Sequence, residues 1–164
     1  MLIKKSPNLR AVFLSIYIAF FAAYLFVGLQ PAGAESYEIS ALLEIPTINL
    51  TSDVTTLHQD GRNLTTPDQI VGSFTRSKHR TLLIGHSTTV FQNLWQLQNG
   101  DKIIYDDTLY VVENIETIEK SSVDMEELLR SPSSNDSLVL MTCAGDLLGN
   151  GDATHRLIIT ASSM

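Results

Sequence analysis

The chain has 164 residues, of which 44% are hydrophobic, and a formal net charge of −7 at pH 7. This length allows one globular domain and an accessory segment, and the hydrophobic fraction excludes general disorder. The charge is unevenly placed, because residues 1–34 hold three basic residues and no acidic one, whereas residues 35–164 hold 8 basic and 18 acidic residues. A body with a charge of −10 excludes nucleic acid as a partner, since its phosphates attract Lys and Arg.

The front of the chain predicts a membrane anchor. Residues 11–29 contain no charged side chain, and a helix of this length nearly matches the hydrocarbon core of a bilayer, which is about 30 Å thick. Lys4, Lys5 and Arg10 precede this segment, so the positive-inside rule places the N-terminus in the cytoplasm. The predicted organisation is a basic cytoplasmic tail (1–10), a single transmembrane helix (11–29), a linker (30–40) and an extracellular domain (41–164).

The end of the apolar segment leaves one alternative open. Ala32, Gly33 and Ala34 have the small-residue form of a signal-peptidase site, so cleavage after Ala34 would release the body. The apolar run exceeds the roughly 7–15 residues that are usual in a secretory signal, which favours an uncleaved anchor. In both cases the body of the chain is exported.

The body predicts a mainly antiparallel β domain. Short apolar runs rich in Ile, Val and Tyr are typical of strands, whereas polar, turn-rich stretches predict loops. One short helix is expected where apolar residues recur at helical spacing, and another where Ser121 and Asp124 have capping-box spacing. We expect seven or eight strands that close as a barrel or sandwich. In chain order, the predicted elements are an extended segment (41–50), a loop (51–75), a strand (81–85), a helix (91–100) capped by Gly100, a hairpin (102–106 and 109–119) turning at Asp107 and Thr108, a helix (121–130), and strands (138–143 and 156–161) flanking a loop (144–155).

Cys143 is the one cysteine of the chain. Exported domains often pair their cysteines as disulfides, and a lone cysteine cannot pair within its own chain. Its thiol is therefore a buried inert group, half of an intermolecular bridge, or a reactive nucleophile. The predicted position, at the end of an apolar strand and before a loop, suits a nucleophile, because the strand fixes the backbone while the side chain stays accessible.

Two further side chains could complete a site around this thiol. His86 follows an apolar strand, and an imidazole titrating at about pH 6.5 can donate a proton to a leaving amine and later accept one. Arg156 opens the strand after the loop, where hairpin geometry places it beside Cys143. Its permanent charge suits an oxyanion forming on an attacked carbonyl. Taken singly, the three residues have plainer interpretations as a loop histidine, a core cysteine and a surface arginine.

The order and spacing of these motifs resemble the sortase family. The family pattern has an N-terminal anchor, an opening Ile-Pro strand, a Gly-His motif after a strand, a Thr-Cys motif at a strand end, and an arginine thirteen positions later. The resemblance covers about residues 41–161 and implies a closed sortase-type β-barrel. The Gly-His segment is similar to that of the smaller sortases of classes D, E or F, and it does not distinguish among these classes. The matching residues are Ile45-Pro46, Gly85-His86, Thr142-Cys143 and Arg156.

The resemblance implies a cysteine transpeptidase acting at the cell surface. Its catalytic residues would be His86, Cys143 and Arg156, and Thr142 would take part in substrate binding. The substrate would be an exported protein with a C-terminal sorting motif of the LPxTG type, cleaved through a thioester. An amine acceptor, from a cell-wall precursor or a pilin lysine, would then receive the acyl group. A shared membrane surface raises the effective concentration of enzyme and substrate.

No cofactor is expected for this reaction. The acidic residues of the body lack EF-hand spacing, so a solvated acidic face is favoured over a Ca²⁺ site. His155, next to Arg156, is predicted to be a loop histidine. The acidic residues considered for calcium are Asp106, Asp107, Asp146 and Asp152.

Two other classes of protein stay open at the level of sequence. One is a non-catalytic exported β domain in which Cys143 belongs to the core. The other is a cysteine hydrolase, which releases the acyl group to water and shares the first half-reaction of a transpeptidase. An amine acceptor that diverts the product separates transfer from hydrolysis.

Overall fold

The computed structural model describes residues 37–60, 63–130, 135–149 and 152–164. Residues 37–164 form one compact unit. Among the described residues, no helix is long and apolar enough to cross a membrane. The predicted transmembrane helix at 11–29 and the tail before it lie outside the described residues. The first strand begins at Ile39, inside the segment predicted as a linker.

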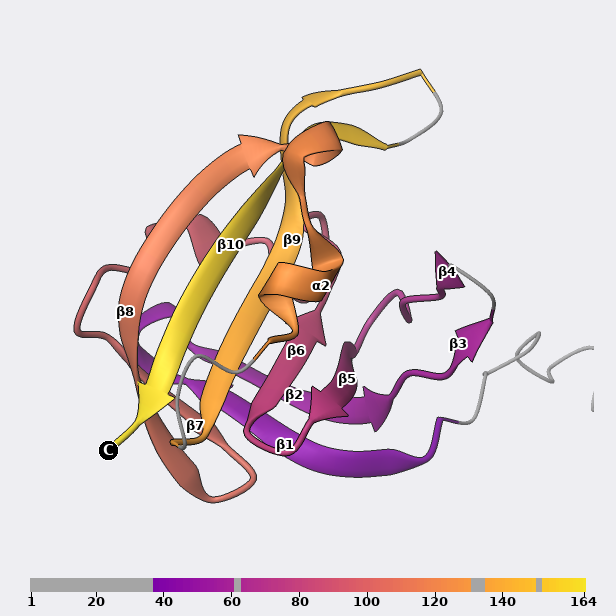
Figure 1. The fold of residues 1–164 in the computed structure, drawn as a ribbon. Helices are drawn as coiled ribbons and strands as arrows, with labels where there is room; N and C mark the ends of the chain where they lie inside the picture. Colours follow the sequence, from indigo (N-terminus) through magenta and orange to yellow (C-terminus); the bar gives the residue numbers. More distant parts are fainter. Residues whose placement is uncertain (1–36, 61–62, 131–134, 150–151) are drawn as a thin grey trace, which may run out of the picture. The chain divides into compact units, whose positions relative to one another are not determined.

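Eight strands close into a barrel in the order β1-β2-β5-β6-β9-β10-β8-β7 (Figure 1). Neighbouring strands are antiparallel except at two places, where β2 lies parallel to β5 and β6 lies parallel to β9. The closed β-barrel expected from the sequence is therefore confirmed. The barrel strands are β1 (Ile39–Ile45), β2 (Leu50–Thr56), β5 (Val71–Ser77), β6 (Arg80–Ile84), β7 (Lys102–Tyr105), β8 (Thr108–Glu119), β9 (Ser137–Leu147) and β10 (Ala153–Ser163), while β3 (Gln59–Asp60) and β4 (Asn63–Leu64) pair separately.

The prediction of a loop at 51–75 is wrong, because strands β2 and β5 occupy much of this segment. The prediction rested on polar composition, yet β2 buries small hydroxyl side chains at Ser52 and Thr55 beside Val54. The hydroxyl of Thr55 donates to the carbonyl of Glu38 at 2.8 Å, so its burial leaves no unpaired donor. β-branched residues such as Thr and Val also favour strands.

The segment 91–100 is mostly turns, with one 3₁₀ helix, η2 (Leu94–Gln96), in place of the predicted helix. Phe91, Leu94 and Leu97 are buried, while Trp95 is 71% exposed. Burial every third residue matches the three-residue period of a 3₁₀ turn, and it explains why Trp95 faces solvent. Gly100, with φ +94°, turns the chain before β7 instead of capping a helix.

The helix predicted at 121–130 is shorter and begins later than expected. A 3₁₀ turn, η3 (Lys120–Ser122), precedes the one α-helix among the described residues, α2 (Met125–Leu128). The Asp124 carboxylate caps α2 by accepting from the N–H groups of Glu126 and Glu127, so Asp124 rather than Ser121 begins the helix.

The turn between β7 and β8 lies one residue earlier than predicted, at Asp106 and Asp107, which both have positive φ.

The β9–β10 hairpin is longer than the sequence predicted. β9 continues to Leu147 and β10 begins at Ala153, so most of the loop predicted at 144–155 is strand. A register shift between Ala153 and His155 and a positive φ at Gly145 bend the hairpin without ending it. Its far end projects beyond the barrel (Figure 1). Cys143 and Arg156 therefore lie within paired strands rather than at strand ends.

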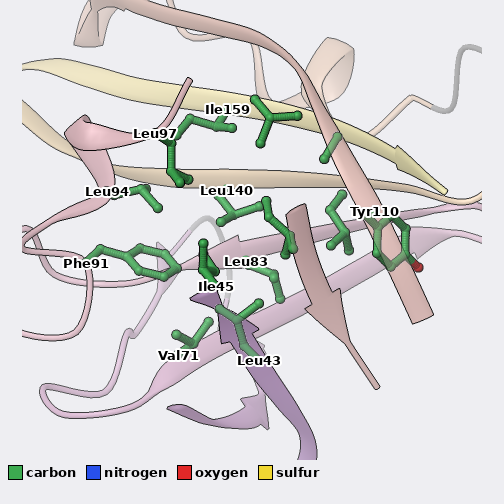
Figure 2. Close-up of a cluster of buried hydrophobic side chains, with 14 of the residues drawn as sticks. Leu43, Ile45, Val71, Leu83, Phe91, Leu94, Leu97, Tyr110, Leu140 and Ile159 are labelled. Atoms are coloured by element: carbon green, nitrogen blue, oxygen red, sulfur yellow. The ribbon is translucent and has the colours of Figure 1, made fainter. Parts of the chain in front are cut away.

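Two hydrophobic clusters lie on the two faces of the barrel wall. The first fills the interior (Figure 2). The second lies on the outer face of β6, β9 and β10, where α2 and the residue after it, Leu129, cover it. Strand alternation divides the two, because Leu138 and Leu140 belong to the inner cluster and Val139 to the outer one. The inner cluster includes Leu43, Ile45, Val71, Leu83, Phe91, Leu94, Leu97, Tyr110, Leu140 and Ile159.

Candidate active site

Cys143 lies between two strands that bring the other predicted catalytic residues to it. On one side β10 runs antiparallel to β9, and Arg156 pairs directly with Cys143. On the other side β6 runs parallel to β9, and the pairing of Ile84 with Met141 has an offset of 57 residues. The same offset separates His86 from Cys143, so continuing this register by two residues places His86 level with Cys143.

The three side chains line one pocket of about 470 Å³. By strand alternation, Cys143 is on the same face of β9 as Met141, which packs against the outer cluster. The pocket thus adjoins the outer cluster, with which it shares Ile84, Met141 and Met125, the first residue of α2. The other residues that line it are Thr66, Ile84, Gly85, Lys120, Met125, Met141 and Thr142.

Cys143 is a free, half-buried thiol and belongs to neither buried cluster. This placement argues against the core cysteine that a non-catalytic β domain would hold.

The guanidinium of Arg156 is held by three acceptors. Its Nη1 donates to the carbonyl oxygens of Ala153 at 3.1 Å and His155 at 2.9 Å, and its Nη2 donates to Asp152 Oδ1 at 2.7 Å. The side chain is 14% exposed. A planar guanidinium held by several acceptors has little freedom to turn, so its orientation relative to Cys143 is fixed.

A second cation, Lys120, contacts the same carboxylate. The Nζ of Lys120 donates to Asp152 Oδ2. Hydrogen bonds from Lys120, then from Arg156, then from the N–H of Ala153 hold the pKa of Asp152 well below its usual range. Asp152 is therefore ionised at neutral pH.

His86 is held much more loosely. Its Nε2 lies 3.4 Å from the carbonyl oxygen of Thr66 and 3.6 Å from Asp68 Oδ1, both longer than an ordinary N–H···O bond. The imidazole is 43% exposed, and the Asp68 side chain is 88% exposed. Part of the predicted loop at 51–75 therefore reaches the site through Thr66.

Gly85 and Thr142 explain how the sequence holds the end of β6 beside β9. A Cβ on Gly85 would lie 2.7 Å from atoms of Val90 and Phe91, so the chain can pass over this buried aromatic ring only with glycine. The Thr142 hydroxyl donates to the carbonyl of Gly85 at 2.7 Å, and Thr142 is 4% exposed. Thr142 thus joins β9 to the residue before His86. A contact between Thr142 and substrate stays a prediction.

Sequence reasoning missed the bridge between Lys120, Asp152 and Arg156. Asp152 was considered only as a calcium ligand, and Lys120 lies far from the three motifs along the chain. Lys120 reaches the site because β8 pairs with β10, with Glu119 opposite His155. The sequence offered one signal of this bridge, the spacing of four residues between Asp152 and Arg156. In a hairpin this spacing does not indicate that two side chains are in contact.

Two other predictions concern the surroundings of the site. The prediction of a loop histidine at His155 is wrong, because His155 lies in β10, where it pairs with Ala144 and Glu119. Its Nδ1 lies 2.8 Å from the Thr154 hydroxyl, and His155 does not line the pocket that holds Cys143. In the part of the chain that the structure describes, no group of three or more His, Cys, Asp or Glu side chains could hold a metal ion. That the protein needs no cofactor stays a prediction.

A closed barrel with a half-buried thiol between an imidazole and a guanidinium suits cysteine-dependent acyl transfer. The family model for the Sortase domain matches residues 43–164. The chain therefore belongs to the sortase family of cysteine transpeptidases. A comparison with curated proteins gave no match.

Several solved sortases share the fold. Streptococcus agalactiae sortase C1 has a TM-score of 0.61 at 19% identity, over 97% of this chain and 89% of that one. Sortase C-1 from Actinomyces oris has a TM-score of 0.58 at 23% identity, over 98% and 82%. Sortase A from Corynebacterium diphtheriae has a TM-score of 0.58 at 20% identity, over 80% of this chain but 63% of that one. At these identities the likeness shows the fold alone.

Proposed function

We propose that this protein cleaves a C-terminal sorting motif of exported proteins and transfers the acyl group to an amine at the cell surface. The proposal rests mainly on the position of Cys143, paired with Arg156 on one side and level with His86 on the other. The common pocket, in which all three residues meet, supports it. The sorting motif would be of the LPxTG type, as the family resemblance implies.

The first half-reaction forms a thioester. The thiolate of Cys143 attacks the scissile carbonyl carbon, and the carbonyl oxygen takes up the negative charge. Arg156 donates hydrogen bonds to this oxyanion. Protonated His86 gives its proton to the departing amine, the C–N bond breaks, and the acyl group stays on sulfur.

The second half-reaction reverses the proton transfers. An incoming amine attacks the thioester carbonyl while neutral His86 accepts its proton. The C–S bond breaks and releases the Cys143 thiolate, and a new amide bond is formed. The proposed acceptor is an amine of a cell-wall precursor or a pilin lysine. No metal or organic cofactor takes part in the proposed reaction.

The apolar part of the pocket comes from Ile84, Met125 and Met141. Methionine side chains adapt their shape to different apolar groups. We propose that they receive an apolar side chain of the sorting motif. The proposed anchor at 11–29 would keep the enzyme on the same membrane surface as its exported substrates.

The test is alkylation of Cys143 by iodoacetamide in the full-length chain in detergent, between about pH 5 and 9. Three samples are compared: the wild type, His86→Ala, and wild type unfolded in guanidinium chloride. We expect the folded thiol to react, with a pH profile that changes when His86 is removed, because the thiol then loses the base beside it that can take its proton. A thiol that stays inert until the protein unfolds would remove the nucleophile from the proposal.

A second experiment separates transfer from hydrolysis. Peptides with LPxTG-type motifs are incubated with the full-length chain, with and without hydroxylamine as an amine acceptor. A transpeptidase gives the hydroxamate at the expense of the free acid. Cys143→Ala is the control for background cleavage. A product that stays free acid at every hydroxylamine concentration would show a hydrolase instead.

A further inference from the structure

Asp152 connects two cations that both line the pocket of Cys143. Its Oδ1 accepts from Arg156 Nη2 at 2.7 Å, and its Oδ2 accepts from Lys120 Nζ. Each carboxylate oxygen thus has a different cationic partner. The family motifs do not include either Asp152 or Lys120.

The bridge joins two parts of the chain that approach each other only in the folded barrel. Lys120 belongs to η3, directly after β8, whereas Asp152 and Arg156 belong to the β9–β10 hairpin. The far end of this hairpin projects beyond the barrel (Figure 1). The carboxylate of Asp152, in the loop between β9 and β10, therefore ties this loop to the turn that follows β8.

The exposed fractions indicate which half of the bridge is less screened by solvent. The side chains of Arg156 and Asp152 are 14% and 23% exposed, whereas that of Lys120 is 50% exposed. Solvent screens an exposed pair more than a half-buried one. The contact between Asp152 and Arg156 is thus the part that restricts the guanidinium, and Lys120 fixes the carboxylate from the other side.

We propose that Asp152 is a positioning residue, whose carboxylate holds the Arg156 guanidinium in the orientation that the oxyanion of the acyl-transfer reaction requires. This inference rests on the proposed function. The carbonyl oxygens of Ala153 and His155 both accept from Nη1. They therefore do not fix the Nη2 end of the guanidinium, which Asp152 holds. A donor that is already oriented loses less freedom when charge develops on the substrate.

The first experiment compares Asp152→Asn with Asp146→Asn in the full-length chain. Asp146 is an exposed residue of the same hairpin and is not among the residues that line the pocket of Cys143. With an LPxTG-type peptide and hydroxylamine, we expect Asp152→Asn to lower kcat/KM about tenfold, mainly through kcat, because a positioning contact acts on the transition state. Asp146→Asn should stay within about twofold of wild type. A rise in kcat/KM for Asp152→Asn would overturn the proposal, since the carboxylate would then withhold Arg156 from substrate.

A double-mutant cycle tests whether the effect passes through Arg156. In the Arg156→Ala background, Asp152→Asn should cause no further loss, because the group it positions is already absent. Equal losses in both backgrounds would overturn the proposal. Alkylation of Cys143 should be the same in Asp152→Asn and wild type, which excludes a general collapse of the site.

A third measurement needs no substrate. Carbon-13 NMR of the aspartate carboxyl groups in the full-length chain follows the titration of Asp152. We expect its pKa to lie well below the usual aspartate range and to rise in Arg156→Ala and in Lys120→Met. If neither substitution moves the titration, the bridge does not exist and the proposal fails, whether or not the peptide is turned over. A wild-type chain that does not turn over any peptide but shows the low pKa would instead count against the proposed function alone.

Discussion

Arg156 and His86 lie on opposite sides of the same cysteine, but the protein holds them very differently. Arg156 is 14% exposed and bound by three acceptors between 2.7 and 3.1 Å. His86 is 43% exposed, and its Nε2 has contacts of 3.4 and 3.6 Å. The strand on the arginine side, β10, extends on both sides of the position opposite Cys143, whereas the strand on the histidine side, β6, ends at Ile84.

This difference matches what each side chain would do in the proposed reaction. A group that stabilises an oxyanion works at one place and benefits from a fixed orientation. A group that gives a proton to one amine and takes it from another must serve two positions in turn, so a looser hold is useful. The rigid half of the site thus follows from a paired strand on one side of Cys143, and the adaptable half follows from a turn on the other.

The largest expected effect on activity comes from replacing Arg156, the side chain that is held rigidly. Arg156→Ala should lower kcat/KM for an LPxTG-type peptide about 100-fold, the cost of losing one oriented oxyanion donor. Arg156→Lys should recover only a small part, because an ammonium group does not reproduce the planar fork that contacts Asp152 and the two carbonyls. Steady-state kinetics on the three proteins gives the ratios. A lysine variant as active as wild type would mean that charge alone matters and orientation does not.

A smaller effect is expected at the turn that places His86. Gly85→Ala should lower the free energy of unfolding by about 1–3 kcal/mol, because the added methyl group meets the side chains of Val90 and Phe91. Gly149→Ala is the matched control, since no atom lies within 4 Å of a Cβ at that position. Thermal unfolding of the full-length variants, followed by near-ultraviolet circular dichroism, measures the difference. Equal stability of the two variants would show that the turn can move away from Phe91 at little cost.

Much of the barrel could be predicted because several of its strands contain short apolar runs rich in Ile, Leu, Val and Tyr. β6 and the two strands of the β7–β8 hairpin follow this pattern, and the structure has them where they were expected. β2 could not be found in this way, since it buries the hydroxyl residues Ser52 and Thr55. The Thr55 hydroxyl meets its acceptor, the carbonyl of Glu38, only when β2 lies beside the start of β1. Composition alone does not show that a polar residue will find a partner.

The positions of the three predicted catalytic residues follow the same division. The neighbourhood of Cys143 and Arg156 could be predicted, because a hairpin pairs residues close in sequence. That His86 lies level with Cys143 depends on the parallel pairing of β6 with β9, a contact between distant segments that residues alone do not reveal. The Lys120 contact was beyond prediction for the same reason, since it requires the pairing of β8 with β10.

The smallest expected effect concerns Asp68, the one acidic side chain that contacts His86 in the described part of the chain. Asp68→Asn should change kcat/KM by less than about twofold, because an 88% exposed carboxylate 3.6 Å away contributes little through solvent. Asp53→Asn, at an exposed position of β2 outside the pocket, is the control. Steady-state kinetics for both variants at low and high salt measures the effect, since salt screening would weaken any attraction between Asp68 and His86. A loss of tenfold or more for Asp68→Asn alone would mean that the carboxylate orients the imidazole, and that the histidine side is held as firmly as the arginine side once substrate is bound.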